Sequence, residues 1–299
     1  MMPRFLFFAV LAFAAVAAHA AAPLSVWVSI PPQRTLAEAL GGERVSVEVL
    51  VRPRERPDQY SPGARQMARL AKADAYFGIG VPVEERLFPR IRSGMPGVRV
   101  VPDPEPEAAH AEEAEGDRDD GHGRRRDHGH DHAHDHGGKD PHVWMDPLAM
   151  LPRVERMEAV LAELDPDGAA LYAANGERLR ERLRGLHAAI RERLAPHGGR
   201  SFFINHPSLG HFAERYGLRQ RSIEHSGAPP SARRMAELID AARRAGVRTI
   251  FAQPAFGRTS AGVLARQIGA EVETVDPLAE DYFRNMRRIA AALARSFGG

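Results

Sequence analysis

Residues 171–194 read LYAANGERLRERLRGLHAAIRERL, and this pattern is that of a single long helix. The large apolar side chains share a helical spacing, with arginine and glutamate between them: Leu171, Leu179, Leu183, Leu186, Ile190 and Leu194. Asp-Pro-Asp at 165–167 separates this helix from a helical segment at 150–164, and Pro-His-Gly-Gly at 196–199 ends it. A helix over residues 167–194 is roughly 42 Å long. It is long enough to run along a protein of two lobes.

Strand-like and helix-like segments alternate on both sides of this helix. Before it, the pattern predicts strands at 25–30, 45–51, 75–80 and 98–101, with helices at 31–40, 62–72 and 83–92. After it, strands are predicted at 201–205, 218–223, 248–252 and 271–275, with helices at 207–216, 231–245, 259–268 and 280–297. Such alternation is typical of parallel sheets.

We therefore predict an α/β fold with two lobes, each built on a central, mostly parallel four-stranded sheet flanked by helices. A length of 299 residues also favours two domains. The predicted boundaries are residues 21–166 for the N-terminal lobe, 167–195 for the linking helix and 196–299 for the C-terminal lobe.

The first residues, MMPRFLFFAVLAFAAVAAHA, have the pattern of an export signal. Arg4 precedes an apolar run at 5–18, and Ala-His-Ala at 18–20 matches a cleavage site. The run is shorter than the roughly 20 residues that a membrane-spanning helix needs. We expect cleavage after residue 20 and a soluble periplasmic protein; an uncleaved membrane anchor is the other interpretation.

Composition limits the chemistry that is available. The chain has no cysteine, which excludes disulfides, cysteine nucleophiles and cysteine-ligated zinc, so a metal must bind through His, Asp or Glu. The formal net charge is +2 and the arginines are scattered, so the sequence predicts no nucleic-acid partner.

Residues 127–142, DHGHDHAHDHGGKDPH, concentrate metal-binding side chains. Imidazole is the commonest protein ligand for zinc and copper, and a purification tag would usually lie at a terminus. The alternate histidines are His128, His130, His132, His134 and His136. Since residues 102–139 contain almost no large apolar residue, we predict a mobile loop. Its histidines suit weak, exchangeable, accessory metal capture.

Three further ligand-type residues lie where the fold would place them. His206 and Asp276 each follow a predicted strand, and His142 lies in DPHVWMDP at 140–147. Ligands of open α/β sheets bind at the carboxyl ends of the strands. The alternative for each residue is a helix cap, which the prolines after His206 and Asp276 would suit.

The order of lobe, His/Asp-rich loop, long helix and second lobe resembles the cluster A-I solute-binding proteins of zinc and manganese ABC importers. The motifs that carry this resemblance are DPHVWMDP at 140–147, NHPSLGHFAERYGL at 205–218, FAQPAF at 251–256 and DPL at 276–278. It implies a rigid long helix, a divalent ion bound between the lobes, delivery to an inner-membrane permease, and a monomer that is not an enzyme.

By this resemblance, His142, His206 and Asp276 are three of the four metal ligands. The fourth position departs from the family, because Asp58 in ERPDQYSP at 55–62 stands where a histidine is expected. A second carboxylate favours harder ions such as Mn²⁺, whereas the histidine tract favours Zn²⁺. We predict Zn²⁺, with Mn²⁺ as the alternative. Asp58 could instead cap the helix at 62–72, with water or a tract histidine as fourth ligand.

Other candidates and other functions are weaker. Glu224 and His225 follow a strand and could line the cleft; His187, His197 and His211 have the pattern of surface or packing residues. A metal buffer that works through the tract alone is a second function. A zinc hydrolase is a third, but the sequence lacks an HExxH motif.

Overall fold

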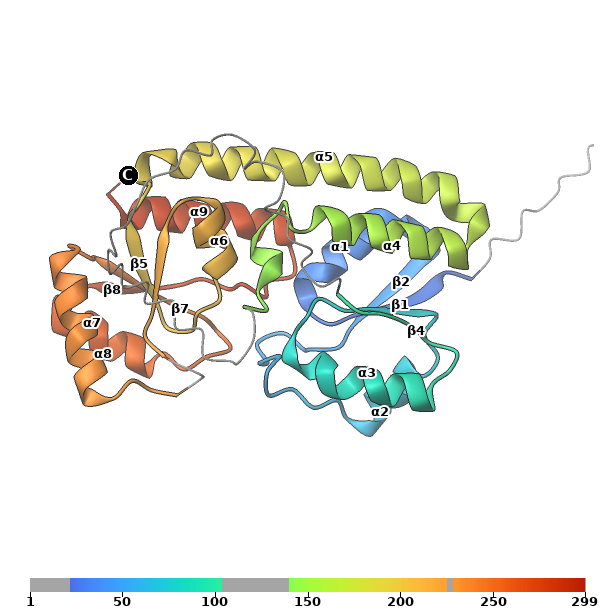
Figure 1. Ribbon diagram of the computed structural model, residues 1–299, viewed down its shortest axis with the longest axis horizontal. Helices are drawn as coiled ribbons and strands as arrows, with labels where there is room; N and C mark the ends of the chain where they lie inside the picture. The colour runs from blue at the N-terminus through green and yellow to red at the C-terminus, as the bar shows by residue number, and fades with distance from the viewer. Residues whose placement is uncertain (1–21, 104–139, 225–227, 299) are drawn as a thin grey trace, which may run out of the picture.

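The computed structural model describes residues 22–103, 140–224 and 228–298. Two α/β lobes lie side by side beneath helix α5 (Ala169–Leu194), which runs over both of them (Figure 1). The predicted fold class is confirmed, because each lobe contains a sheet of four parallel strands flanked by helices. The predicted signal peptide at 1–20, the tract histidines at 128–136 and His225 lie outside the described residues.

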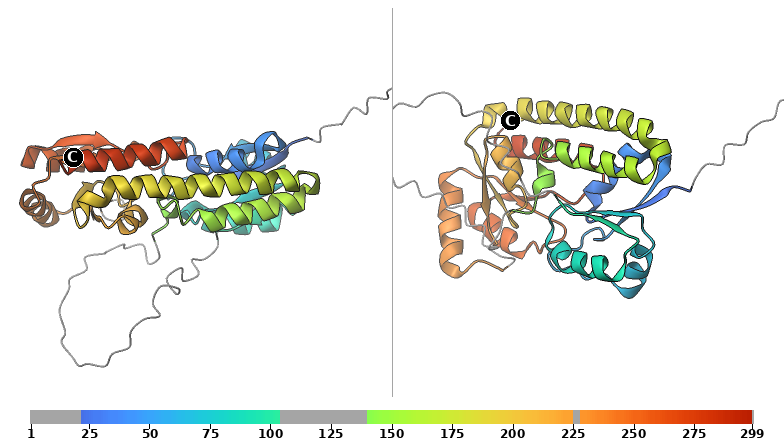
Figure 2. Two further views of the ribbon diagram at one scale, coloured as in Figure 1. Left: turned by 90° about the horizontal axis from the view of Figure 1, so that it is seen from above. Right: turned by 45° about the vertical axis from the view of Figure 1, so that its right-hand side comes forward.

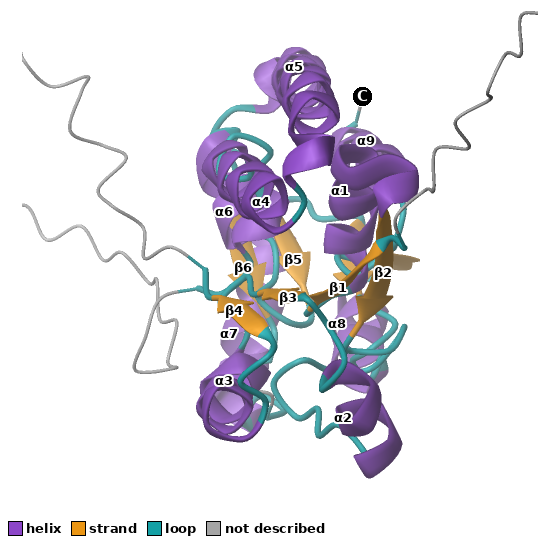
Figure 3. Ribbon diagram, turned by 90° about the vertical axis from the view of Figure 1, so that its right-hand side faces the viewer, coloured by secondary structure: helices purple, strands orange, loops and turns teal. Residues whose placement is uncertain are grey.

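The N-terminal sheet has the strand order β2-β1-β3-β4. Its strands are β1 (Leu24–Val28), β2 (Val45–Val49), β3 (Ala75–Phe77) and β4 (Arg99–Val101). Its helices are α1 (Pro31–Gly41), α2 (Ala64–Leu70) and α3 (Pro82–Gly94). The sheet lies between two helical layers, with α1 on one face and α2 and α3 on the other (Figure 3). Valine-rich strands such as VSVEV in β2 suit this position.

The C-terminal sheet repeats the same order as β6-β5-β7-β8. Its strands are β5 (Ser201–Ile204), β6 (Arg219–Ser222), β7 (Thr249–Ala252) and β8 (Glu271–Thr274). Its helices are α6 (Gly210–Arg215), α7 (Ala232–Arg244), α8 (Thr259–Ile268) and α9 (Tyr282–Ser296). The two lobes therefore share one topology, and the carboxyl ends of their strands carry the loops of the candidate site.

Local sequence explains where several helices begin and end. Ser231 and Asp281 precede α7 and α9, and their side chains accept hydrogen bonds from the backbone N–H groups of Arg234 and Arg284. Gly269 ends α8 with φ +72°, in the left-handed region that glycine adopts without steric cost.

Helix α5 packs against α1, α4 (Leu151–Leu164) and α9, and the view from above in Figure 2 shows it running along these three helices. Its buried face carries Tyr172, Gly176, Leu179, Leu183, Leu186, Ile190 and Leu194. Leu171 was predicted on the apolar face but is 40% exposed, because Tyr172 takes that place in the helical repeat.

One continuous set of buried apolar side chains passes through both lobes. It includes Val28 in β1, Leu186 in α5, Phe202 in β5 and Leu293 in α9. A smaller separate cluster, with Leu238 and Leu264, lies beneath α7 and α8. Helix α5 is therefore part of a shared core.

Hydrogen bonds also join the lobes. Trp144, in the 3₁₀ turn Val143–Met145, donates from Nε1 to the Pro277 carbonyl at 2.9 Å, and Tyr282 donates to the Trp144 carbonyl at 2.8 Å. Arg34 of α1 pairs with Glu280 at 2.8 Å. Within the parts of the chain that the structure describes, no helix combines the length and apolarity needed to cross a membrane.

Candidate metal site

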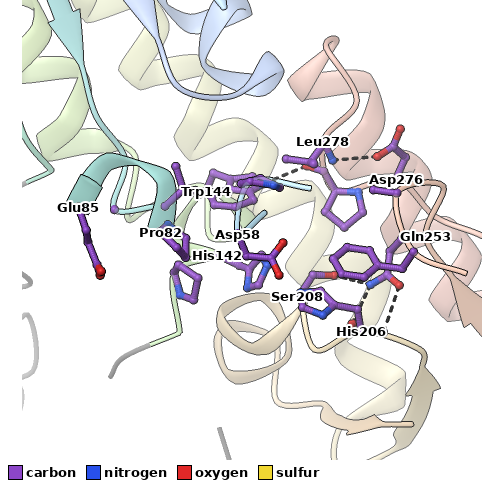
Figure 4. Close-up of a pocket in the computed structure, with 17 residues that line it drawn as sticks. Asp58, Pro82, Glu85, His142, Trp144, His206, Ser208, Gln253, Asp276 and Leu278 are labelled. Atoms are coloured by element: carbon purple, nitrogen blue, oxygen red, sulfur yellow. Dashed lines mark hydrogen bonds between the residues drawn. The ribbon is translucent and has the colours of Figure 1, made fainter. Parts of the chain in front are cut away.

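A cavity of about 390 Å³ lies between the lobes. All four predicted ligands line it: Asp58, His142, His206 and Asp276 (Figure 4). They come from four separate loops, two of which directly follow β5 and β8. The structure thus brings together residues that are far apart in the chain.

Asp58 lies in the loop after β2 and pairs with an arginine of the same loop. Arg56 donates from Nη2 and Nε to the two carboxylate oxygens of Asp58, at 2.7 and 3.2 Å. Asp58 does not cap α2, because Gly63 is the residue that precedes this helix. The loop is tethered by Tyr60, whose hydroxyl donates to Gln66 at 2.8 Å.

His142 is oriented by Asp140. The Asp140 carboxylate lies 2.6 Å from His142 Nδ1 and also accepts the His142 backbone N–H at 3.0 Å. Burial alone would raise the pKa of Asp140, but the hydrogen bonds and charge of His142 outweigh it and lower this pKa to about 2. A neutral imidazole that donates through Nδ1 presents its Nε2 lone pair to a metal.

His206 follows β5, and Gln253 holds its backbone. Gln253 accepts the His206 N–H at 3.2 Å and donates to the His206 carbonyl at 2.7 Å and to the Ser208 hydroxyl at 2.7 Å. The imidazole stacks on the Phe256 ring, with centroids 3.8 Å apart and planes 12° apart. His206 does not cap α6, which begins after Leu209.

The two imidazoles approach each other across the cavity. The ring centroids of His142 and His206 are 5.3 Å apart. One ring comes from the segment before α4 and the other from the C-terminal sheet. This distance places two potential nitrogen donors in one space.

Asp276 follows β8 on the far side of the cavity. Its Oδ1 accepts the Leu278 N–H at 3.0 Å, and Figure 4 shows the carboxylate directed toward that backbone. Burial raises the pKa of Asp276, while this hydrogen bond and the charges of Arg54 and Arg288 oppose the rise. Asp276 does not cap α9, which Asp281 does.

The four side chains share a cavity without forming a finished coordination sphere. Among the residues that the structure describes, no three His, Asp or Glu side chains are grouped closely enough to hold one ion. Two imidazoles and two carboxylates are nonetheless a donor set that suits zinc. The structure is an open cleft with donors on both walls.

Several residues that the sequence ranked lower have defined roles in packing. His211 Nε2 lies 3.0 Å from the Asp140 carbonyl, and His187 stacks on Tyr216 with centroids 5.6 Å apart, so neither is a free surface residue. Glu224 is buried and does not line the cavity. Sequence reasoning missed Asp140, although a carboxylate two positions before a candidate histidine was a usable signal.

Two parallel-sheet lobes, bridged by a long helix and with donors facing a shared cleft, define a bilobed solute-binding protein. A family model described as "Zinc-uptake complex component A periplasmic" matches residues 26–296, and the chain belongs to this family. This match confirms the resemblance to cluster A-I proteins. Since the family consists of uptake components, the prediction that the chain is not an enzyme is also confirmed.

Solved structures share the fold along nearly the whole chain. A crystal structure of ZnuA has a TM-score of 0.79 and 30% identity, covering 92% of this chain and 100% of that one. A zinc-bound deletion mutant of ZnuA has a TM-score of 0.78 and 30% identity, covering 93% and 99%.

Sequence relatives point the same way. The zinc-binding lipoprotein AdcA of Streptococcus pneumoniae is 26% identical over 257 residues, which are 85% of this chain and 50% of that protein. The zinc-binding protein AdcA of Streptococcus pyogenes is 30% identical over 161 residues, which are 50% and 31% of the two chains. The chain therefore spans half or less of the length of these curated relatives.

Proposed function

We propose that the chain is the solute-binding protein of an ABC importer, which captures Zn²⁺ between its lobes and delivers it to an inner-membrane permease. The observation that carries this proposal is the meeting of His142 and His206, with ring centroids 5.3 Å apart, in one cavity with Asp58 and Asp276. Capture and release need coordination only, so no bond of the cargo has to be broken.

The donor set supports zinc as the cargo. Imidazole nitrogens suit zinc better than manganese, which prefers oxygen ligands. In our proposal His142, His206 and Asp276 ligate the ion, and Asp58 is a candidate for the fourth position. A bound cation would offset the cost of burying the negative charge on Asp276. Relatives named as zinc-binding proteins favour the same ion.

The shared core limits how the cleft can close. Hydrogen bonds such as that from Trp144 to Pro277 already join the lobes. We therefore infer that the donors converge through local movements of their loops, with little rotation of one lobe against the other. The proposed setting is the periplasm, after removal of residues 1–20, and the proposed working form is a monomer. The tract at 128–136 is proposed as an accessory, weaker binding segment.

The test is a competitive zinc titration of the chain without its signal peptide, combined with elemental analysis. We expect one tight ion per chain, and we expect that ion to persist when residues 127–136 are deleted. His206→Ala should lose the tight site, because it removes a proposed ligand. His197→Ala is the matched control, since His197 contacts Phe297 away from the cavity.

Two outcomes would contradict the proposal. If deletion of residues 127–136 removes nearly all zinc binding, the chain is a metal buffer that works through the tract. If the tract-deleted protein prefers Mn²⁺ over Zn²⁺, the zinc assignment is wrong and the manganese alternative replaces it.

A further inference from the structure

A cation of the chain itself, Arg56, is paired with one of the residues that line the cleft. The Arg56 guanidinium donates to both carboxylate oxygens of Asp58, at 2.7 and 3.2 Å. A fork of this kind is the strongest contact that an arginine makes with a carboxylate. Each oxygen of Asp58 therefore already accepts one charge-assisted hydrogen bond, so an ion that binds Asp58 must share the carboxylate with Arg56 or displace it.

Arg56 also contacts the opposite lobe. Its guanidinium carbon lies 4.5 Å from the centroid of the Phe256 ring, and the imidazole of His206 stacks on the same ring. Phe256 thus contacts both Arg56 and the proposed ligand His206. A cation over an aromatic face is attracted by the ring quadrupole, so Phe256 stabilises Arg56 in this position.

Solvent screens this cation only in part. The side chains of Arg56 and Asp58 are 20% and 31% exposed. The charge of Arg56 also acts on Glu224 of the C-terminal lobe, where it opposes the rise in pKa that burial causes. Arg56 therefore interacts electrostatically with a carboxylate of each lobe.

We propose that Arg56 determines metal specificity by acting as a tethered competitor of the cargo ion. This inference rests on the proposed function. While Arg56 holds Asp58, the cleft offers an incoming ion two imidazoles and one carboxylate, a set that suits zinc. A manganese ion loses the additional oxygen donor that it would need. Arg56 thereby counteracts the preference for harder ions that Asp58 alone would confer.

The central variant is Arg56→Gln, which removes the charge and keeps a polar side chain. It should raise Mn²⁺ affinity by about five- to tenfold, because Asp58 becomes available, and change Zn²⁺ affinity by roughly threefold or less. Both affinities are measured by competitive titration of the full chain without its signal peptide. Arg65→Gln is the matched control, since Arg65 is an exposed arginine of α2 outside the cavity.

Asp58→Asn completes a double-mutant cycle. If Arg56 masks Asp58, this substitution should change Mn²⁺ affinity by less than about twofold alone, and by about five- to tenfold when Arg56→Gln is also present. Equal effects in both backgrounds would overturn the inference, because Asp58 would then act independently of Arg56. Arg56→Lys keeps the charge without the two-pronged hydrogen bond. Its Mn²⁺ affinity should lie between that of the wild type and that of Arg56→Gln.

The outcomes separate the two proposals. If the wild type binds neither ion tightly while folded, as judged by circular dichroism, the proposed function fails. If the wild type binds zinc tightly but Arg56→Gln and Arg65→Gln show the same ratio of Zn²⁺ to Mn²⁺ affinity, only the role of Arg56 fails. If Arg56→Gln does not fold, Arg56→Lys is the deciding variant. A ratio of Zn²⁺ to Mn²⁺ affinity identical to that of the wild type would then contradict the inference.

Discussion

At the scale of single residues, the cleft is organised by partners that hold the proposed ligands in place. Asp140 engages Nδ1 of His142 at 2.6 Å, and Gln253 bonds to both backbone polar groups of His206. Such contacts fix the ring orientation and the backbone before an ion arrives. The entropic cost of ordering these ligands is therefore met during folding, which leaves more of the interaction energy for binding.

Replacing Asp140 tests this orientation. Asp140→Asn keeps the shape but removes the charge that favours a proton on Nδ1 of His142. We expect zinc affinity to fall by about 10- to 100-fold, measured by competitive titration. Asp240→Asn, an exposed position of α7, should leave affinity unchanged. An Asp140→Asn protein that binds zinc as the wild type does would show that His142 needs no such partner.

At the scale of elements, a polar cluster anchors the start of α5. Asp165, between α4 and α5, accepts hydrogen bonds from Nε and Nη2 of Arg44 and from the Tyr172 hydroxyl, each at 2.6 Å. A Cβ at Gly168 would collide with the Asp165 carboxylate, which explains the glycine there. The cluster joins the 3₁₀ turn after α1 (Gly42–Arg44) to the turn from which the long helix begins.

This cluster should make stability depend on acid pH. The hydrogen bonds from Arg44 and then from Tyr172 lower the pKa of Asp165 from its usual 3.8 to about 2. Because the pKa is lower in the folded state, the stabilisation is present above pH 3.8 and is lost as pH falls toward 2.

Asp165→Asn should therefore lower the Tm at pH 7 by about 2–4 °C. The difference in Tm between this variant and the wild type should narrow as pH falls from 4 to 2. Thermal melting monitored by circular dichroism measures it. Asp167→Asn is the control, because Asp167 is an exposed neighbour in the same turn. A difference that stays constant over this pH range would mean that the charge of Asp165 contributes nothing.

At the scale of the whole molecule, the two lobes share their main core. The main set of buried side chains includes residues of both sheets and of α5 and α9. Interlobe bonds such as Arg34 to Glu280 and Arg215 to Asp146 reinforce this connection. Neither lobe can unfold without exposing apolar surface that belongs to the other.

Thermal unfolding should therefore be a single cooperative transition, with equal calorimetric and van't Hoff enthalpies. Leu186→Ala should lower the free energy of unfolding by about 2–5 kcal/mol and shift the transition without splitting it. Leu171→Ala, on the exposed face of the same helix, should change the free energy of unfolding by less than about 0.5 kcal/mol. Two resolved transitions in differential scanning calorimetry would contradict the shared core.

Element positions were largely predictable because periodicity is a local property. The helix predicted at 259–268 coincides with α8, and the strand predicted at 248–252 differs from β7 by one residue. The helix predicted at 207–216 begins later, as α6 at Gly210, since Gln253 holds the segment from His206 to Ser208 in a different conformation. The lobe boundaries and the ligand roles stay predictions.

The histidine-rich tract and the resemblance to metal-binding solute-binding proteins indicated a metal-capturing cleft. The strand-end residues His206 and Asp276 agreed with it, because parallel strands bring their carboxyl ends to one edge. The contacts between the lobes around this cleft could not be predicted from the sequence pattern. Trp144 and Pro277 lie 133 positions apart, and Arg56 meets Phe256 only because the lobes face each other. Such pairs depend on three-dimensional packing, which local pattern does not encode.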